Sequence, residues 1–554
     1  MPTDAPSSLP PVLRPDAPPQ HALDELVARF AIGVRGDTAG VRLSGLTLAT
    51  ADLRPGDVFV AVQGVNRHGA EFAAQAADKG AVAVVTDAAG ADAAEAGGLP
   101  VVLVEDPRGI LGELSAWVYR TGRDDTLPLL LGTTGTNGKT SVSHLLEGIL
   151  GQLGVVTGLS STAERHIAGH VIVSRLTTPE AYEMHALLAL MRERGVEAVA
   201  VEVSAQALSR RRVDGIVFDV AGFTNLTHDH LDDYADMREY FEAKLPLFRR
   251  DRARRAVVCI DSEPGAEVVA RSEIPTVTVG TPVLASDPDA AAAADWVVEI
   301  LDERPTGTQF RLSARDGRTL TTVVPVIGRH MAANAGLAIV MILEAGYAWE
   351  RIAAALDGDR IQAHLPGRTQ LVSGERGPAV YVDFGHSPDA FEKTLAAVRR
   401  VTPGRVLMLF GADGDRDATK RHDMGRTAVE GSDILVLTDH HPRFEDPDSI
   451  RATLREGALR ARPDAQIHEF SPPERAIVEA VALVGEGDAI LWAGPGHQDY
   501  RDIRGRRTPY SARELARRAL RAAGWPVPEP TWPVPYPDDA TPSSDPERPF
   551  ASPL

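Results

Sequence analysis

Short runs of apolar residues alternate with stretches of helical spacing along most of this chain. Between residues 21 and 124, for example, the apolar runs GDVFVAV, GAVAVVTD and LPVVLVED are separated by alanine-rich segments that favour helix. Strands that alternate with helices are typical of α/β domains with parallel sheets. The pattern therefore predicts an α/β fold over nearly the whole chain.

Breaks in this alternation predict where the units begin and end. The proline-glycine junction HLPGR covers residues 364–368. We expect three units, 21–124, 125–363 and 364–523, which suits 554 residues at about 100–200 residues per domain. The Pro-, Ser- and Ala-rich residues 1–20 and the Pro-rich residues 524–554 predict a disordered arm and tail.

The second unit opens with LPLLLGTTGTNGKTSVSHLLEGIL, residues 127–150, which predicts a buried strand, a glycine-rich turn and an amphipathic helix. This arrangement can hold the phosphates of ATP or a close relative. Backbone N–H groups and Lys139 would meet the phosphates, and the Thr140 hydroxyl would reach Mg²⁺. The strict pattern GxxxxGK requires glycine at position 133, whereas this chain has Thr133 and places Gly132 one residue earlier. A chance Gly-Lys-Thr turn is the alternative. The residues expected to contact the nucleotide here are Gly135, Thr136, Asn137, Gly138, Lys139, Thr140 and Ser141.

Composition narrows the classes of partner. A formal charge of -19 and a pI near 5.3 argue against nucleic-acid binding, so the ligands should be small molecules. A single cysteine, Cys259, excludes an intramolecular disulfide and fits a reducing compartment. The chain shows no signal-peptide pattern, and every apolar run is broken before about 18 residues. We expect a soluble cytoplasmic protein without membrane contact.

Polar residues follow six of the predicted strands. Ligands of open α/β sheets lie beyond the carboxyl ends of the strands, although any single polar group there is more often a solvated loop or a helix cap. Glu202 and His230 are the natural partners of Thr140 for Mg²⁺, which prefers oxygen ligands. The six groups are Glu202 and Ser204; Asn225, His228, Asp229 and His230; Asp383 and His386; Asp413, Asp415, Arg416 and Asp417; His440, His441 and Arg443; and His497 and Gln498.

These residues resemble those of the Mur ligases, ATP-dependent amide-forming enzymes of bacterial cell-wall synthesis. The resemblance covers most of the chain, and FGHSPDA with GDRD is similar to the branch that adds a third amino acid to UDP-N-acetylmuramoyl-L-alanyl-D-glutamate. The shared motifs are TGTNGKT at 134–140, LTTPE at 176–180, EVS at 202–204, NLTHDHLD at 225–232, YFEAKLPLF at 240–248, PGR at 366–368, DFGHSPDA at 383–390, GDRD at 414–417, PRFEDP at 442–447 and AGPGH at 493–497.

The resemblance implies an N-terminal UDP-substrate-binding domain, a central P-loop-type ATPase domain with a mostly parallel sheet, and a C-terminal Rossmann-like domain that binds the amino acid. It implies an acyl-phosphate mechanism with ATP and Mg²⁺, in which Lys244 is carbamylated by CO₂ and faces a second Mg²⁺. A monomer is expected. The implied roles are catalytic for Lys139, Glu202, His230 and Lys244; metal-binding for Thr140, Glu202, His230 and Lys244; nucleotide-binding also for Asn334, Arg368 and Asp383; UDP-substrate-binding for Thr177, Thr178, Ser204 and Arg212; and amino-acid-binding for Arg416, His440, His441, Arg443, Gly494 and Gln498.

The chain departs from the family pattern at both substrate ends. The DSR before PGD is replaced by ATA at 49–51, and the family's Asn and Gln positions hold Leu176 and Arg210, which leaves UDP binding open. DNPR becomes HHPR at 440–443, and GKGHE becomes GPGHQ, ending in Gln498. The retained Arg416 and Arg443 can still bind the α-carboxylate of the incoming amino acid. Loss of the glutamate charge at position 498 argues against diaminopimelate and leaves lysine, ornithine or another amino acid.

Two other classes of protein remain open. One is a divergent Mur-like ligase that joins a different carboxylate and amine, which the altered first unit would allow. The other is a non-catalytic nucleotide-binding or scaffolding protein. Retention of the whole metal set argues against the second class, and a P-loop GTPase or motor lacks support from the later motifs.

Overall fold

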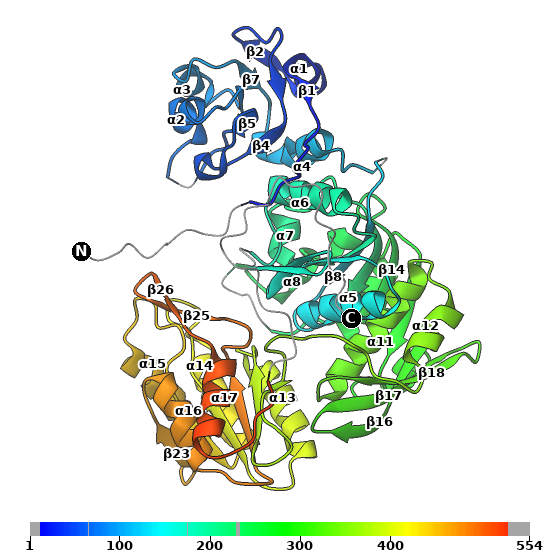
Figure 1. Ribbon diagram of the computed structural model, residues 1–554, viewed down its shortest axis with the longest axis vertical. Coiled ribbons are helices and arrows are strands. Elements are labelled where there is room, and N and C mark those ends of the chain that lie inside the picture. The colour runs from blue at the N-terminus through cyan, green and yellow to red at the C-terminus, as the bar shows by residue number, and fades with distance from the viewer. Residues whose placement is uncertain (1–11, 65, 124, 174–175, 229–232, 530–554) are drawn as a thin grey trace.

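The computed structural model describes residues 12–64, 66–123, 125–173, 176–228 and 233–529. Each of the three units is built around its own main sheet, and the units follow one another along the chain (Figure 1). The main sheets have five, eleven and six strands, most of them parallel. This architecture confirms the predicted α/β class. In the described ranges, no helix is both long and apolar enough to span a bilayer.

The first unit holds a five-stranded sheet in the order β2-β7-β6-β5-β4, parallel except for β2. Val12 and Arg14 are buried, and the Arg14 guanidinium lies 2.6 Å from Asp57 Oδ1. Residues 12–15 of the segment expected to be a disordered arm are therefore packed, whereas Asp16, Ala17 and Gln20 are exposed. Its elements are β1 (His21–Ala22), α1 (Leu23–Phe30), β2 (Gly33–Arg35), β3 (Arg42–Leu43), β4 (Gly45–Thr47), β5 (Asp57–Val60), α2 (Ala73–Asp78), β6 (Ala83–Thr86), α3 (Ala91–Glu95), β7 (Val101–Leu103) and α4 (Pro107–Tyr119).

The second unit holds eleven strands in the order β11-β10-β9-β12-β8-β13-β14-β15-β16-β17-β18. The strands from β9 to β16 are parallel, and an antiparallel hairpin extends each edge. The strands are β8 (Leu129–Thr134), β9 (Thr157–Ser160), β10 (Glu164–Ile167), β11 (His170–Val173), β12 (Ala198–Glu202), β13 (Phe218–Phe223), β14 (Ala253–Cys259), β15 (Thr276–Gly280), β16 (Trp296–Arg304), β17 (Gly307–Ala314) and β18 (Thr319–Val324). The helices are α5 (Lys139–Gln152), α6 (Ala181–Glu193), α7 (Ala205–Ser209), α8 (Met237–Glu242), α9 (Glu263–Arg271), α10 (Pro288–Ala292), α11 (Arg329–Glu344) and α12 (Trp349–Leu356).

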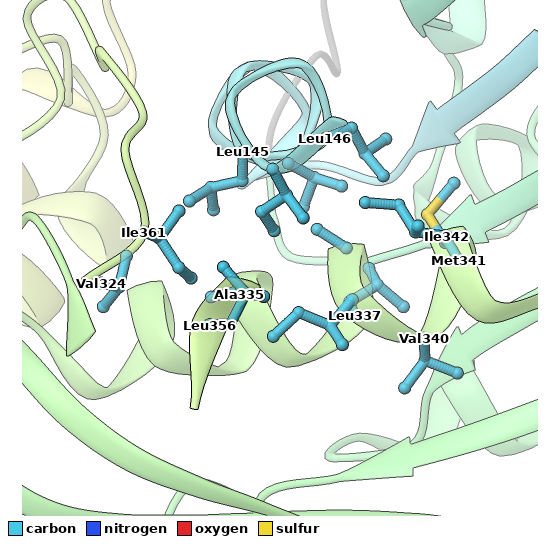
Figure 2. Close-up of a cluster of buried hydrophobic side chains, with 14 of the residues drawn as sticks. Leu145, Leu146, Val324, Ala335, Leu337, Val340, Met341, Ile342, Leu356 and Ile361 are labelled. Carbon is cyan, nitrogen blue, oxygen red and sulfur yellow. The ribbon is translucent and has the colours of Figure 1, made fainter. Parts of the chain in front are cut away.

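Two helices, α5 and α11, pack together on one face of this sheet. Leu145 and Leu146 of α5 meet Leu337 and Met341 of α11 in a continuous buried cluster (Figure 2). Burying a leucine-sized side chain contributes about 1.5–3 kcal/mol. The α5 helix begins at the phosphate loop, so this packing fixes the loop against the sheet.

The third unit holds six strands in the order β19-β20-β24-β21-β22-β23, parallel except for β19. Trp525 packs against Gly377, so the first residues of the expected tail contact this unit. The elements are β19 (Gln370–Leu371), β20 (Ala379–Asp383), α13 (Pro388–Val401), β21 (Val406–Phe410), α14 (Arg421–Gly431), β22 (Ile434–Leu437), α15 (Pro447–Ala461), β23 (Gln466–Glu469), α16 (Pro473–Ala482), β24 (Ala489–Ala493), the hairpin β25 (Tyr500–Ile503) and β26 (Arg506–Pro509), and α17 (Ala512–Ala522).

Candidate functional site

The loop between β8 and α5 has the backbone of a phosphate-binding turn. Gly135 and Gly138 adopt φ angles of 143° and 92°, which side chains rarely tolerate. A Cβ on Gly135 would lie 2.0 Å from Thr224 Oγ1, and one on Gly138 would lie 2.8 Å from Asn334 Oδ1. Both glycines are required by conformation and by close packing. The loop leads into the N-terminus of α5, where free N–H groups favour an anion.

The displaced glycine of the sequence motif has a structural explanation. Thr133 lies within β8 and pairs with Glu202 of β12 and Gly222 of β13, so it needs no unusual backbone angle. Gly132 faces Phe218, whose ring would be 2.8 Å from a Cβ at position 132. Glycine is therefore needed for packing at 132 and for the turn at 135.

Two lysines converge on this loop. The Nζ atoms of Lys139 and Lys244 each donate to the carbonyl oxygen of Gly135 at 3.1 Å, and Lys139 also donates to Thr136 O at 2.7 Å. Lys244 is only 1% exposed and its Nζ lies 3.9 Å from the centre of the Tyr240 ring. The alternative interpretation of Lys244 as a solvated helix residue is wrong.

Two side-chain oxygens that could bind a metal ion lie side by side where α5 begins, one from α5 and one from β12. The Thr140 hydroxyl donates to Glu202 Oε2 at 2.9 Å, and Thr162 N donates to the same oxygen at 2.8 Å. Both side chains are buried. A hydroxyl beside a carboxylate is a ligand set that fits Mg²⁺, and the lysines on the loop fit the polyphosphate that would carry the ion. His230, also predicted to bind this metal, lies outside the described residues.

The third unit contributes Arg368 to the same place. Its Nη2 donates to Thr140 Oγ1 at 2.9 Å, and its guanidinium stacks on Phe384 at 4.4 Å from the ring centre. Burial lowers the pKa of Arg368, while Glu202 and Asp383 oppose that shift. Asp383 accepts from Thr369 N at 2.7 Å and from Gly385 N at 2.6 Å, and so fixes the turn that carries Arg368. The alternative of an exposed loop arginine is wrong.

Asn334 and Asn137 complete the surroundings of the loop. Asn334 is buried on α11 against Gly138. Asn137 accepts from Asn225 Nδ2 through its carbonyl at 3.1 Å, and its Nδ2 donates to Asp389 Oδ2 of α13 at 3.1 Å. Asp389 lies in the motif DFGHSPDA, but sequence reasoning gave it no role, because nothing local shows that α13 faces the loop.

The residues predicted to contact the UDP substrate form a chain of hydrogen bonds that starts at Glu202. Thr178 Oγ1 donates to Glu202 O at 2.8 Å, and Ser204 N donates to Thr178 Oγ1 at 3.3 Å. Thr177 Oγ1 accepts from Thr162 Oγ1 at 3.0 Å. Arg212 Nε donates to Glu180 Oε1 at 2.9 Å.

Glu180 is a site residue that the sequence analysis missed. It also accepts from Arg108 of α4 at 2.7 Å, and so joins the first and second units. It belongs to LTTPE, and that motif is the only signal that could have found it.

The residues predicted to bind the amino acid lie at the carboxyl ends of β21, β22 and β24. His440 Nδ1 lies 2.7 Å from Asp413 Oδ1, and His441 Nε2 lies 2.9 Å from Gln498 Oε1. Arg443 donates to Gly414 O at 2.9 Å, whereas Arg416 is exposed. Burial raises the pKa of Asp413, but the hydrogen bond and charge of His440 outweigh it and hold the pKa well below its usual range. Burial and the neighbouring His440 lower the pKa of His441 to about 4.

Other polar residues after strands lie at the rim or between units. His228 and His386 are exposed, and His386 Nδ1 lies 2.9 Å from Phe384 O. Burial and the charge of Arg368 lower the pKa of His497 well below its usual value. A Cβ on Gly367 would lie 2.0 Å from the carbonyl carbon of Gly496, so the junction PGR and the loop AGPGH pack backbone to backbone.

Fold and site together define a nucleotide-dependent α/β enzyme whose phosphate loop is completed by a later unit. Comparison with known families identifies it further. Residues 133–342 match the Mur ligase middle domain, 367–496 the Mur ligase glutamate ligase domain, and 42–119 the Mur ligase family catalytic domain. The chain belongs to the Mur ligase family, and it is an ATP-dependent acid–amino-acid ligase of peptidoglycan biosynthesis.

Individual relatives agree with this family. The chain is 56% identical over 517 residues to a UDP-N-acetylmuramyl-tripeptide synthetase of Leifsonia xyli subsp. xyli. The matched residues cover 93% of this chain and 99% of the relative. It is 40% identical over 493 residues to a UDP-N-acetylmuramoyl-L-alanyl-D-glutamate–2,6-diaminopimelate ligase of Streptomyces coelicolor, covering 88% and 95%. The fold is similar to that of a solved ligase of the latter type, with a TM-score of 0.61, 24% identity and coverage of 89% and 98%.

Proposed function

We propose that this ligase joins an amino acid to the D-glutamyl carboxylate of UDP-N-acetylmuramoyl-L-alanyl-D-glutamate, using ATP and Mg²⁺. The observation that carries the proposal is the hydrogen-bonded path from the phosphate loop to the predicted substrate residues, through Thr140, Glu202 and Thr178. An acid substrate bound by the residues at the far end of this path would lie next to the γ-phosphate. The name of the Streptomyces coelicolor relative contains this acid substrate, and the name of the Leifsonia xyli relative, a tripeptide synthetase, agrees with the addition of a third amino acid.

The proposed reaction has two steps. A carboxylate oxygen of the substrate attacks the γ-phosphorus and the bond to ADP breaks, which leaves an acyl phosphate. The amine of the incoming amino acid then attacks the acyl carbon, loses a proton, and expels phosphate. Lys139 and Arg368 stabilise the charge that accumulates on the transferred phosphoryl group. When bound, Mg²⁺ held by Thr140 and Glu202 would neutralise part of the same charge.

We infer that Lys244 is carbamylated. A neutral amine at its Nζ takes up CO₂ and loses a proton, which gives a carbamate. The modification replaces a second cation beside Lys139 with an anion that can bind a metal ion. The burial of Lys244 at the loop supports the inference, because a buried, unmodified ammonium there would lie close to the ammonium of Lys139.

An amino-acid panel tests the proposed function. Purified protein is incubated with ATP, Mg²⁺ and UDP-N-acetylmuramoyl-L-alanyl-D-glutamate, and ADP release is measured with each amino acid. Release that depends on both the UDP substrate and an amino acid supports the proposal. ADP release with a different acid, and none with the muramoyl dipeptide, would instead establish a divergent Mur-like ligase. That second candidate is favoured by the first unit, where Ala49 and Ala51 replace polar family residues.

A further inference from the structure

Arg14 holds both ends of a loop in the first unit. The loop covers residues 48–51, directly after β4, and includes the ATA at 49–51 that stands where the family pattern is DSR. Arg14 Nη2 donates to Leu46 O at 3.4 Å before the loop and to Asp52 O at 3.1 Å after it. The guanidinium therefore closes the loop across its base.

The same guanidinium is fixed in the interior of the first unit. Arg14 Nη1 lies 2.6 and 2.7 Å from the two carboxylate oxygens of Asp57, and both residues are buried. Only glycine fits beside this pair at position 45, since a Cβ on Gly45 would lie 2.3 Å from Asp57 Oδ1 and 3.0 Å from Arg14 Nη1. A guanidinium carries its donors in a rigid planar fork, so one end binds the carboxylate while the other binds the loop carbonyls.

The segment that carries Arg14 is also attached to the second unit. Asp16 N and Ala17 N donate to the two carboxylate oxygens of Glu193 at 2.7 and 2.9 Å. Glu193 is the last residue of α6, and its neighbour Arg194 forms an ion pair with Asp16. Arg14 therefore does not lie on a free end, because the chain is held both before the loop and at α6.

The first turn of α6 brings the loop close to the predicted substrate residues. Tyr182 of α6 belongs to the same buried cluster as Leu46. Burial and the nearby carboxylates of Glu183 and Asp52 raise the pKa of Tyr182. Since α6 directly follows the motif LTTPE at 176–180, the loop lies at the side of the first unit where the predicted UDP-substrate residues are.

Alanine at positions 49 and 51 leaves this loop without the polar side chains of the family pattern. Ala49 N donates to Thr47 Oγ1 at 3.0 Å, and Ala49 O accepts from Asp52 N at 3.0 Å, which makes a tight turn. Polar contacts from the two alanines can come only from backbone groups. A backbone group cannot be redirected by a change of rotamer, so such contacts depend on what holds the ends of the loop.

We propose that Arg14 is a positioning residue for the UDP substrate, which fixes loop 48–51 in the shape in which its backbone binds the nucleotide end of that substrate. The inference rests on the proposed function and states how a first unit without DSR still binds a uridine diphosphate. Arg14 acts through the loop and not by contact with the substrate. Asp57 keeps the guanidinium in place, and Glu193 keeps the segment in place.

Arg14→Lys separates the two roles of the arginine. A lysine keeps the ion pair with Asp57 and so avoids an unpaired buried carboxylate, but its ammonium cannot span Asp57 and both loop carbonyls. We expect the Kd and the KM for UDP-N-acetylmuramoyl-L-alanyl-D-glutamate to rise about tenfold or more, with kcat and the affinity for MgADP unchanged. Arg42→Lys, the same substitution at an exposed position of β3, is the matched control and should change none of these.

Hydrogen exchange of the loop amides is a measurement that does not depend on turnover. The UDP substrate should slow exchange at residues 48–51 in the wild-type protein. In Arg14→Lys, these amides should exchange faster without ligand, and protection should require about tenfold more substrate.

Three results would overturn the positioning role. They are an unchanged Kd for the UDP substrate in Arg14→Lys, an equal loss of MgADP affinity in that variant, and binding of the substrate to the wild-type protein without protection of residues 48–51. Protection of the loop by the UDP substrate, without ADP release with any amino acid, would overturn the proposed function alone.

Discussion

Lys139 and Lys244 donate to one and the same carbonyl oxygen, that of Gly135, each at 3.1 Å. The two lysines are far apart in sequence, and only one of them belongs to the phosphate-loop motif. Two ammonium groups so close repel each other, more strongly in a site of low dielectric than in water. Either a bound polyphosphate or a change of charge on Lys244 relieves this repulsion.

Replacing Lys244 tests the proposed carbamate. We predict that Lys244→Ala lowers the rate of ADP formation about 100- to 1,000-fold, as for loss of one group that stabilises transition-state charge. Lys244→Arg should be equally impaired, because it keeps a positive charge but cannot form the carbamate. A ¹³C carbamate signal, seen by NMR in the wild-type protein in labelled bicarbonate, should be missing from both variants. Full activity of Lys244→Arg would exclude the modification as a requirement.

The glycine at position 138 should be indispensable for nucleotide binding. We predict that Gly138→Ala weakens MgADP binding at least about tenfold, since its φ of 92° costs a side chain about 1–2 kcal/mol and its Cβ would displace Asn334. Calorimetric titration measures the affinity. Gly151→Ala, in the helix that follows Gly138, is the control, because a Cβ there meets no atom within 4 Å outside the adjacent helix backbone. This control should keep its affinity and gain about 0.5–1 kcal/mol in stability.

Arg368 should contribute to nucleotide affinity although it lies beyond the second unit. We predict that Arg368→Ala weakens MgADP binding about 10- to 100-fold, which corresponds to about 1.5–3 kcal/mol for a charged hydrogen bond. Arg368→Lys should retain only part of the MgADP affinity that Arg368→Ala loses, because an ammonium lacks the planar fork of the guanidinium. Arg376→Ala, at an exposed position of the same unit, serves as the control. An affinity unchanged in Arg368→Ala would contradict its placement at the phosphates.

A buried histidine should make stability depend on pH. His166 lies 2.8 Å from Glu147 of α5 and 3.0 Å from Glu164 of β10; burial lowers its pKa, but the two carboxylates outweigh burial and raise the pKa to about 9. Burial lowers the pKa of the adjacent His144 and brings that of His364 to about 4. His144 and His364 therefore remain neutral between pH 6 and pH 9.

Because the folded pKa of His166 exceeds its unfolded value near 6.5, the folded state binds more protons between these two values. The stabilisation is complete below pH 6.5 and is lost as the pH rises through 9. Urea unfolding at pH 6, 7.5 and 9 should therefore give a free energy of unfolding that decreases as the pH rises, by up to about 3 kcal/mol. In His166→Gln, this decrease in the free energy of unfolding with rising pH should be missing. An equal slope in both proteins would show that other groups cause it.

Local sequence was sufficient for the phosphate loop and for the α/β class. The strand, the turn glycines and the helix of residues 127–150 are adjacent in the chain, so their spacing alone predicts their geometry. Arg368, Asp389 and Glu180 belong to recognisable motifs, but their contacts with Thr140, Asn137 and Arg108 cross between units. Contacts of this kind depend on how separate sheets pack, which no local pattern encodes.

The sequence by itself determined the order of strands and helices, the phosphate loop and the groups of polar residues that follow the strands. These follow from backbone preferences and from hydrophobic periodicity, which act over short distances along the chain. Only the tertiary structure decided that Lys244 shares a carbonyl with Lys139, that residues 12–15 are packed, and that His440 lies against Asp413. Each of these depends on burial and on partners distant in sequence, and burial is defined only once the units have folded and packed together.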